Sequence, residues 1–193
     1  MTSDTVDRDD WFVTHSGRVF FVRDPDPSAI CIEDVAHALA HVCRFGGHCD
    51  THYSVAQHSI FVSHEVTPHL ALHALLHDAA EAYIGDVIRP LKHQLPEYKA
   101  IEVRVEAAIA EAFGLRPLIA IEREAIKAAD RVALATERRD VHPLAESMSR
   151  KVRWVEDELR VKPSPRKIVP MSAMGAGDAF RSRFADLLPG GAS

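Results

Sequence analysis

Three features are scarce in this chain of 193 residues, and each absence excludes a class of protein. No apolar run approaches the roughly 18 residues that span a membrane as a helix. Positive charge is not in excess, because 23 Lys and Arg stand against 28 Asp and Glu, so we expect no binding partner among nucleic-acid polymers or anionic membranes. Only three cysteines are present and none forms a CxxC pair, which excludes a disulfide framework and predicts a reducing, cytoplasmic setting.

The length predicts one domain, at roughly 150 residues per domain. Residues 1–10 carry four aspartates and no apolar core, so we expect a disordered lead rather than a signal peptide. We expect residues 11–193 to form a single domain, with its core at 11–140 and a C-terminal extension at 141–193.

Apolar periodicity predicts an all-α fold with a small β addition. Two β-rich runs, 11–13 and 18–22, flank a Gly turn and predict an N-terminal hairpin. After residue 31 the period of the apolar residues is helical, and capping and proline signals mark the helix starts. The expected helices run from 32 to about 44, from 54 onward, and over about 68–83, 96–113, 117–139 and 176–188.

Histidine is concentrated in one segment, because nine of the 12 histidines lie between residues 37 and 77. Either most of them are incidental, or this segment holds a metal ion. Several pairs have the i,i+4 spacing that can bind zinc on a helix, but we expect His37 and His41 to be packing or hydrogen-bonding groups near the site. We expect no contact with a phosphate from His52 and His64. We expect His69 and His73 at the surface or behind the metal ligands.

The setting of His77 and Asp78 separates them from these histidines. They stand with Glu81 among Leu and Ala, on a predicted helix apolar enough to be buried. Buried ionisable groups are costly unless they are paired or bound to a metal. Asp130 has a similar apolar setting, and His58 follows the predicted cap at residue 54. A buried His–Asp ion pair is the simpler interpretation of the dipeptide alone.

The order His58, His77-Asp78, Asp130 resembles that of the HD-domain superfamily of metal-dependent phosphohydrolases. The flanking motifs are similar to those of the 5′-deoxynucleotidases and of the phage-type deoxynucleoside triphosphohydrolases, and the similarity covers about residues 11–140. The resemblance implies an all-α HD-domain helical bundle with a small N-terminal β-hairpin. The motifs are YSVAQHS at 53–59, LHDAAE at 76–81, IGD at 84–86 and KAAD at 127–130.

The resemblance also implies a metal centre. Two imidazoles and two carboxylates suit a divalent ion with open positions for water, so Mn²⁺, Co²⁺, Zn²⁺, Fe²⁺ and Ni²⁺ are candidates. Such an ion would lower the pKa of water and polarise a phosphoryl oxygen. Glu81 would act as general acid or base, and Asp86 would have a supporting role. The implied ligands are His58, His77, Asp78 and Asp130.

Substrate contacts follow from the same resemblance. Arg44 matches a phosphate-binding arginine, whose planar fork suits a phosphate, and Phe45 would lie beside the sugar or base. Lys127 stands three residues before Asp130, which favours a polyphosphate substrate. His48, in the loop after Arg44, is a further candidate for contact with a phosphate. The remaining candidates are Ile88 and Pro90 for the base pocket and Lys92 for the phosphate tail.

We therefore expect an enzyme that removes phosphate or triphosphate from 2′-deoxynucleotides, with dATP giving deoxyadenosine and triphosphate as one candidate reaction. A 5′-deoxynucleotidase acting on dNMPs is an alternative, and hydrolysis of cyclic nucleotides or (p)ppGpp fits the flanking motifs less well. An alternative outside the enzymes is a non-catalytic HD module that binds nucleotide. Members of the superfamily are commonly dimers or hexamers, so we expect a homo-oligomer.

Overall fold

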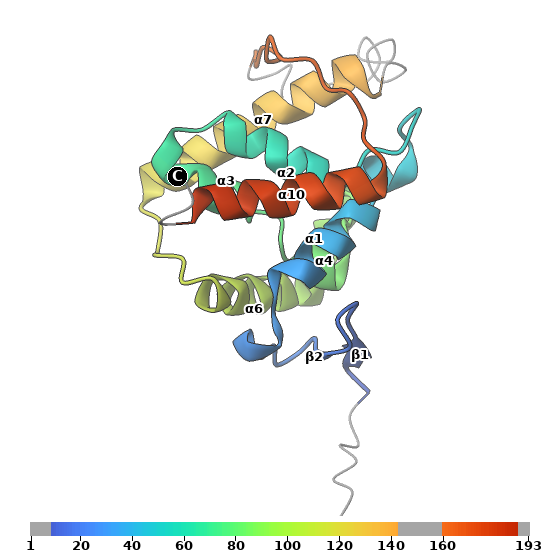
Figure 1. Cartoon of the computed structure of the whole chain (residues 1–193), viewed down its shortest axis with the longest axis vertical. Helices are drawn as coiled ribbons and strands as arrows, with labels where there is room; N and C mark the ends of the chain where they lie inside the picture. Colours follow the sequence, from blue (N-terminus) through green and yellow to red (C-terminus); the bar gives the residue numbers. More distant parts are fainter. Residues whose placement is uncertain (1–8, 143–159, 189–193) are drawn as a thin grey trace, which may run out of the picture.

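The computed structural model describes residues 9–142 and 160–188, and it is mostly helical (Figure 1). A two-stranded antiparallel sheet stands at the N-terminus, where β1 (Trp11–Val13) pairs with β2 (Val19–Phe21). The all-α class and the small hairpin are therefore confirmed. Apart from Asp9 and Asp10, the predicted disordered lead lies outside the described residues, as do residues 143–159 and 189–193 of the predicted extension. None of the described helices is both long and apolar enough to cross a membrane.

The helices form two groups in Figure 1, with α6 set apart from α2, α7 and α10. Single 3-10 turns connect some of them, at η1 (Pro27–Ala29), η2 (Arg44–Gly47) and η3 (Pro68–Leu70). The α-helices are α1 (Ile32–His41), α2 (Val55–His64), α3 (Ala71–Leu75), α4 (Glu81–Ile84), α5 (Arg89–Lys92), α6 (Pro96–Ala112), α7 (Ala120–Asp140) and α10 (Ala173–Leu187).

Several predicted boundaries are confirmed by the local hydrogen bonds. The hydroxyl oxygen of Ser54 accepts a bond from the amide of Gln57 at 3.3 Å, which caps α2 as its sequence indicates. Pro96 opens α6, and Gly114 follows its end with a φ of 61°. The first predicted helix was too long, because α1 ends at His41 and Arg44 opens the separate turn η2.

The expectation of one helix over residues 68–83 is wrong. Helix α3 ends at Leu75, residues 76–80 form turns, and α4 begins at Glu81. Amides in this stretch bond three residues back: Glu81 N donates to the Asp78 carbonyl at 3.0 Å, and Ala79 N donates to the Leu76 carbonyl at 3.1 Å. This tighter winding replaces the α-helical pattern. His77 and Asp78 therefore project from a turn and not from one helix face.

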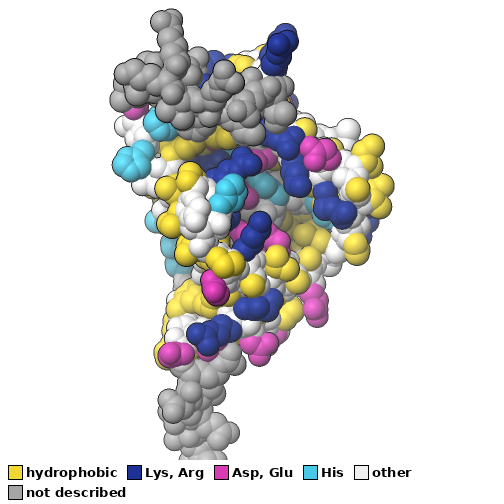
Figure 2. Space-filling model, turned by 180° about the vertical axis from the view of Figure 1, so that it is seen from behind, with side chains coloured by type: hydrophobic (Ala, Val, Ile, Leu, Met, Phe, Trp, Pro, Cys, Tyr) yellow, Lys and Arg dark blue, Asp and Glu magenta, His cyan; other side chains and the backbone are white. Residues whose placement is uncertain are grey.

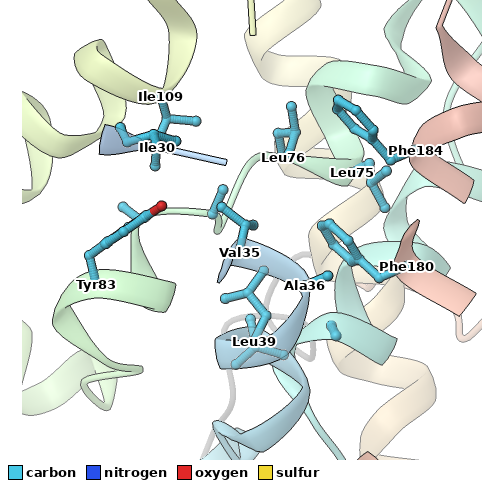
Figure 3. Packing of buried hydrophobic residues seen from close by; sticks show 14 of the residues in the cluster. Ile30, Val35, Ala36, Leu39, Leu75, Leu76, Tyr83, Ile109, Phe180 and Phe184 are labelled. Carbon is cyan, nitrogen blue, oxygen red and sulfur yellow. The ribbon is translucent and has the colours of Figure 1, made fainter. Parts of the chain in front are cut away.

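The main core forms where α10 crosses α1 and α2. Phe180 and Phe184 of α10 point toward Leu75 of α3 and toward α1 (Figure 3). Phe180 and Leu75 are fully buried, and so is Val35 on α1. Buried aromatic and aliphatic area of this kind is the main stabilising contribution to a fold. The C-terminal helix is thus part of the core and not an appendage.

A strap of chain, residues 160–172, ties the second helix to the seventh. The amide group of Gln57 on α2 donates to the Val169 carbonyl at 2.6 Å and accepts from Met171 N at 2.9 Å. On α7, the Thr136 hydroxyl accepts a bond from Ser164 N at 2.9 Å. These bonds hold α2 and α7 together near His58 and Glu137.

We predict that Phe180→Ala lowers the free energy of unfolding by about 3–5 kcal/mol, because it leaves a cavity in a dry core. Urea unfolding followed by far-UV circular dichroism measures the change. Met174→Ala is the matched control on the same helix, since Met174 is 77% exposed and should change stability by less than about 0.5 kcal/mol. Equal effects of the two substitutions would contradict the place of α10 in the core.

Candidate metal centre

His58 on α2 and His77 in the 76–80 turn come together with their rings 5.3 Å apart. Nδ1 of His58 lies 2.6 Å from Oε1 of Glu137, and Nδ1 of His77 lies 2.8 Å from the Ala74 carbonyl oxygen. Both partners are acceptors, so each Nδ1 carries the proton and donates it. When the ring is neutral, the lone pair of its Nε2 is then free, which is the tautomer of a metal-binding histidine.

Two carboxylates face these Nε2 atoms. Oδ2 of Asp78 lies 3.4 Å from Nε2 of His58 and 3.2 Å from Nε2 of His77. Oδ1 of Asp130, on α7, lies 3.3 Å from Nε2 of His58. The donor atoms of His58, His77 and Asp130 all lie within 4.8 Å of one another. The Asp130 side chain is 43% exposed and that of Asp78 is 24% exposed, so the cluster opens to solvent on its carboxylate side.

The donor set fits a divalent ion. Within residues 9–142 and 160–188, Nε2 of His58 and Nε2 of His77 are buried without a hydrogen-bond partner. Leaving two buried ring nitrogens without a hydrogen bond is costly, and a bound cation would satisfy both. Two nitrogen and two oxygen donors suit several first-row divalent metals, and nothing in the set selects one of them.

The electrostatics of the cluster favour a cation. Burial alone would lower the pKa of His58 and of His77, but the negative carboxylates around them raise both pKa values instead. Burial would likewise raise the pKa of Asp78, but the imidazoles hold it well below its usual range, and that of Asp130 is lowered in the same way. The carboxylates thus remain charged and provide the negative potential that attracts a metal ion.

Glu137 is a buried member of the site that the sequence analysis did not single out. Its side chain is 0% exposed and accepts bonds from the His58 ring at 2.6 Å and from the Tyr53 hydroxyl at 3.0 Å. Burial would raise its pKa, but Arg44 and His58 lower it to about 2. A signal was available, because Glu137 follows Asp130 by seven residues, which is two helical turns on the same face.

Arg44 lies beside this cluster and is held by two carboxylates. Its Nη2 is 3.4 Å from Glu137 Oε2, and its Nη1 is 3.6 Å from Asp86 Oδ2. The guanidinium also lies 5.5 Å from the centre of the Phe45 ring. Phe45 has a φ of 55°, a left-handed conformation that is unusual for a bulky residue and is often found at binding sites. Its ring meets His142 edge-on at 5.3 Å.

Glu81 begins α4 and is 5% exposed. Burial, aided by the charges of Asp78 and Asp86, raises its pKa to about 9, so the metal-free site holds Glu81 protonated at neutral pH. Nζ of Lys92 lies 3.9 Å from Glu81 Oε1 and 2.7 Å from Glu102 Oε1. A protonated, buried carboxyl group is suited to donating a proton.

The other predicted substrate residues lie at different places. His48 and Ile88 both lie near Gly46, since a Cβ built there would lie 3.8 Å from a side-chain carbon of each. Pro90 and Lys127 are exposed, and among the described residues no ion pair joins Lys127 to the cluster. Figure 2 shows basic, acidic and histidine side chains gathered around a hollow in one face of the molecule. The structure thus brings together the four predicted ligands, Arg44, Phe45, Glu81, Asp86 and Lys92.

Several of the other histidines have partners outside the cluster. The His41 ring bonds the His37 carbonyl at 2.8 Å, and His37 stacks on His15 with ring centres 3.6 Å apart. His52 contacts the Ala40 carbonyl at 3.1 Å, and His73 contacts that of Arg116 at 2.9 Å. The expected packing and hydrogen-bonding roles of His37 and His41 are confirmed. His69 lies at the surface as expected, and His64 is exposed as well.

Comparison with known proteins identifies relatives over nearly the whole chain. The uncharacterized protein YfdR of Escherichia coli is 38% identical over 174 residues, which cover 90% of this chain and 93% of YfdR. An uncharacterized protein of Rhodobacter capsulatus is 35% identical over 189 residues, which cover 92% of this chain and 95% of that protein. No protein-family model matches the chain.

We predict that His77→Ala weakens binding of Mn²⁺ and Co²⁺ by more than about tenfold, because it removes one of two imidazole donors. Chelator-treated protein is soaked in each metal, and the bound ion is measured by elemental analysis. His69→Ala is the control, since His69 is 62% exposed and lies outside the cluster. Equal metal content in the two variants would contradict this site.

We predict that Glu81→Gln flattens the pH dependence of stability in metal-free protein. The folded chain keeps the Glu81 proton up to about pH 9, whereas an unfolded chain releases it near 4.5, so stability falls as pH rises between these values. The slope from this one group is at most about 1.4 kcal/mol per pH unit. Urea unfolding over this range measures it, and a slope unchanged in Glu81→Gln would show that the carboxyl is ionised.

Proposed function

We propose that this chain is a divalent-metal-dependent phosphohydrolase of the HD-domain type that acts on 2′-deoxynucleotides. The chain belongs to the same protein family as Escherichia coli YfdR. One observation carries the proposal: His58 and His77 turn Nε2 atoms that have no hydrogen-bond partner toward the carboxylates of Asp78 and Asp130, with Arg44 beside the cluster. The order and flanking motifs of these residues, which resemble those of the 5′-deoxynucleotidase branch, support it.

The metal would be held by His58, His77, Asp78 and Asp130. A divalent ion in such a site supplies Lewis-acid chemistry, because it lowers the pKa of water and withdraws charge from a phosphoryl oxygen. The Glu137 and Ala74 acceptors keep both imidazoles in the tautomer that presents Nε2. These residues therefore need little rearrangement to bind the ion.

Arg44 would bind the phosphate of the substrate. A guanidinium presents two parallel N–H donors that match two phosphate oxygens. Its Nη1 and Nη2 now face Asp86 and Glu137 at 3.6 and 3.4 Å, which are longer than the usual distances for charge-assisted hydrogen bonds. An incoming phosphate can therefore compete for these donors, and the two carboxylates keep the side chain oriented until it arrives.

Glu81 would handle the proton at the reacting phosphate. Hydrolysis of a phosphate ester or anhydride cleaves a P–O bond, and the leaving oxygen must gain a proton. Glu81 holds a proton in a buried carboxyl group and can donate it to that oxygen. Asp86, whose pKa burial also raises, would support this proton transfer.

The geometry around Lys92 favours a second candidate activity, a 5′-deoxynucleotidase that acts on dNMPs. A triphosphate needs cations for its β- and γ-phosphates, but Lys92 is bound by Glu102 at 2.7 Å. Lys127 is exposed and could bind the outer phosphates of a polyphosphate. Hydrolysis of dATP is therefore the candidate reaction that would use Lys127. The product, phosphate or triphosphate, distinguishes the two reactions.

We predict turnover of dAMP or dATP in the presence of Mn²⁺ or Co²⁺, and a loss of about 10²–10⁴-fold in kcat for Glu81→Gln with metal binding retained. Released phosphate and triphosphate are measured separately. The matched control is Glu124→Gln, since Glu124 is 59% exposed and pairs with Arg131. Protein that binds metal and nucleotide but hydrolyses neither substrate would contradict the enzyme and favour a non-catalytic nucleotide-binding module.

A further inference from the structure

Glu137 contacts two parts of the site with its two oxygens. Oε1 accepts from Nδ1 of His58 at 2.6 Å and from the Tyr53 hydroxyl at 3.0 Å. Oε2 faces Nη2 of Arg44 at 3.4 Å. The carboxylate is 0% exposed, so bulk water cannot compensate when one of these contacts is lost. A single buried group therefore joins a metal ligand to the arginine next to it.

We propose that Glu137 is a positioning residue that couples the two halves of the site, so that a cation at the His58 cluster releases Arg44 for an anion. The inference rests on the proposed function in one respect, namely that Arg44 binds a phosphate group. It adds that the binding of metal and the binding of phosphate are linked through the protein.

The direction of the coupling follows from the hydrogen bonds. Compared with a neutral imidazole, one whose Nε2 binds a cation is a stronger donor at Nδ1, so binding of the cation to neutral His58 draws the negative charge of Glu137 toward Oε1. The contact of Oε2 with Arg44 is already long for a charge-assisted bond, and it weakens further. Arg44 then keeps only Asp86 as its partner among the described carboxylates. Because coupling of this kind is reciprocal, an anion on Arg44 also strengthens metal binding.

A general effect of negative charge is the competing explanation, since any nearby carboxylate attracts metal and repels phosphate. Asp86 separates the two explanations. Like Glu137, Asp86 lies close to Arg44, at 3.6 Å against 3.4 Å. Unlike Glu137, it makes no hydrogen bond or ion pair with His58, His77 or Asp130 in the described part of the chain. Removing its charge should therefore change phosphate binding much more than metal binding.

The experiment uses the full chain, with Zn²⁺ and inorganic phosphate as probes in separate calorimetric titrations. We expect Glu137→Gln to weaken Zn²⁺ binding by about 10- to 100-fold and to tighten metal-free phosphate binding by about threefold or more. We expect Asp86→Asn to tighten phosphate binding while Zn²⁺ affinity stays within about threefold. Equal weakening of Zn²⁺ binding in both variants would overturn the proposal in favour of a general charge effect.

Proton NMR provides a second measurement, which would not change if Glu137 had only a structural role. The Nδ1–H of His58, in a 2.6 Å bond to a carboxylate, should give a far-downfield signal that shifts when Zn²⁺ is added and is absent from Glu137→Gln. Tyr53→Phe removes a donor from the same oxygen and should also shift this signal, which tests the proposal if Glu137→Gln fails to fold. A signal unchanged by Zn²⁺ and by Tyr53→Phe would overturn the coupling.

Failure of the proposed function would appear differently. Wild-type protein that shows the coupled Zn²⁺ and phosphate affinities but hydrolyses no nucleotide keeps the coupling and loses only the enzyme. Turnover with Zn²⁺ affinity unchanged in Glu137→Gln keeps the enzyme and overturns the coupling. Wild-type protein that binds no Zn²⁺ overturns both.

Discussion

The hydrogen bond between His58 and Glu137 is the interaction on which the rest of the site depends. It joins α2 to α7 inside the protein at 2.6 Å, and both side chains are fully buried. A buried carboxylate is costly unless it is fully partnered, and here Tyr53 and Arg44 complete its contacts. The bond also sets the His58 tautomer, so the requirement to satisfy a buried charge is what turns Nε2 toward Asp78 and Asp130.

The surrounding fold serves this arrangement by keeping the second helix against the seventh. The strap at 160–172 bonds Gln57, next to His58, and Thr136, next to Glu137. Helix α10 covers α1 and α2 from the side of the core (Figure 1). Residues 160–188 therefore stabilise the site and contribute none of its four candidate ligands, and the polar cluster sits at the edge of a dry core.

Much of the fold and part of the site could be predicted from the sequence. The hairpin, the Ser54 cap and the helix from Pro96 follow from local signals, because turn and cap residues act over a few positions. The break at 76–80 does not, since Leu and Ala continue through it with helical spacing. The four predicted ligands meet as the motif resemblance implies. Glu137 was missed because it stands among charged neighbours on α7, and its spacing of seven residues from Asp130 was the signal that could have found it.

The sequence by itself determined which residues could bind a metal, because the apolar setting of His77, Asp78 and Asp130 is visible in the residues next to them in the chain. Only the tertiary structure decided how they are used. The packing of α2 on α7 places Glu137 against His58 and Arg44. The turn at 76–80 orients the His77 ring, whose Nδ1 bonds the Ala74 carbonyl. Contacts across 79 and 93 positions of chain are set by helix packing, which local patterns do not encode.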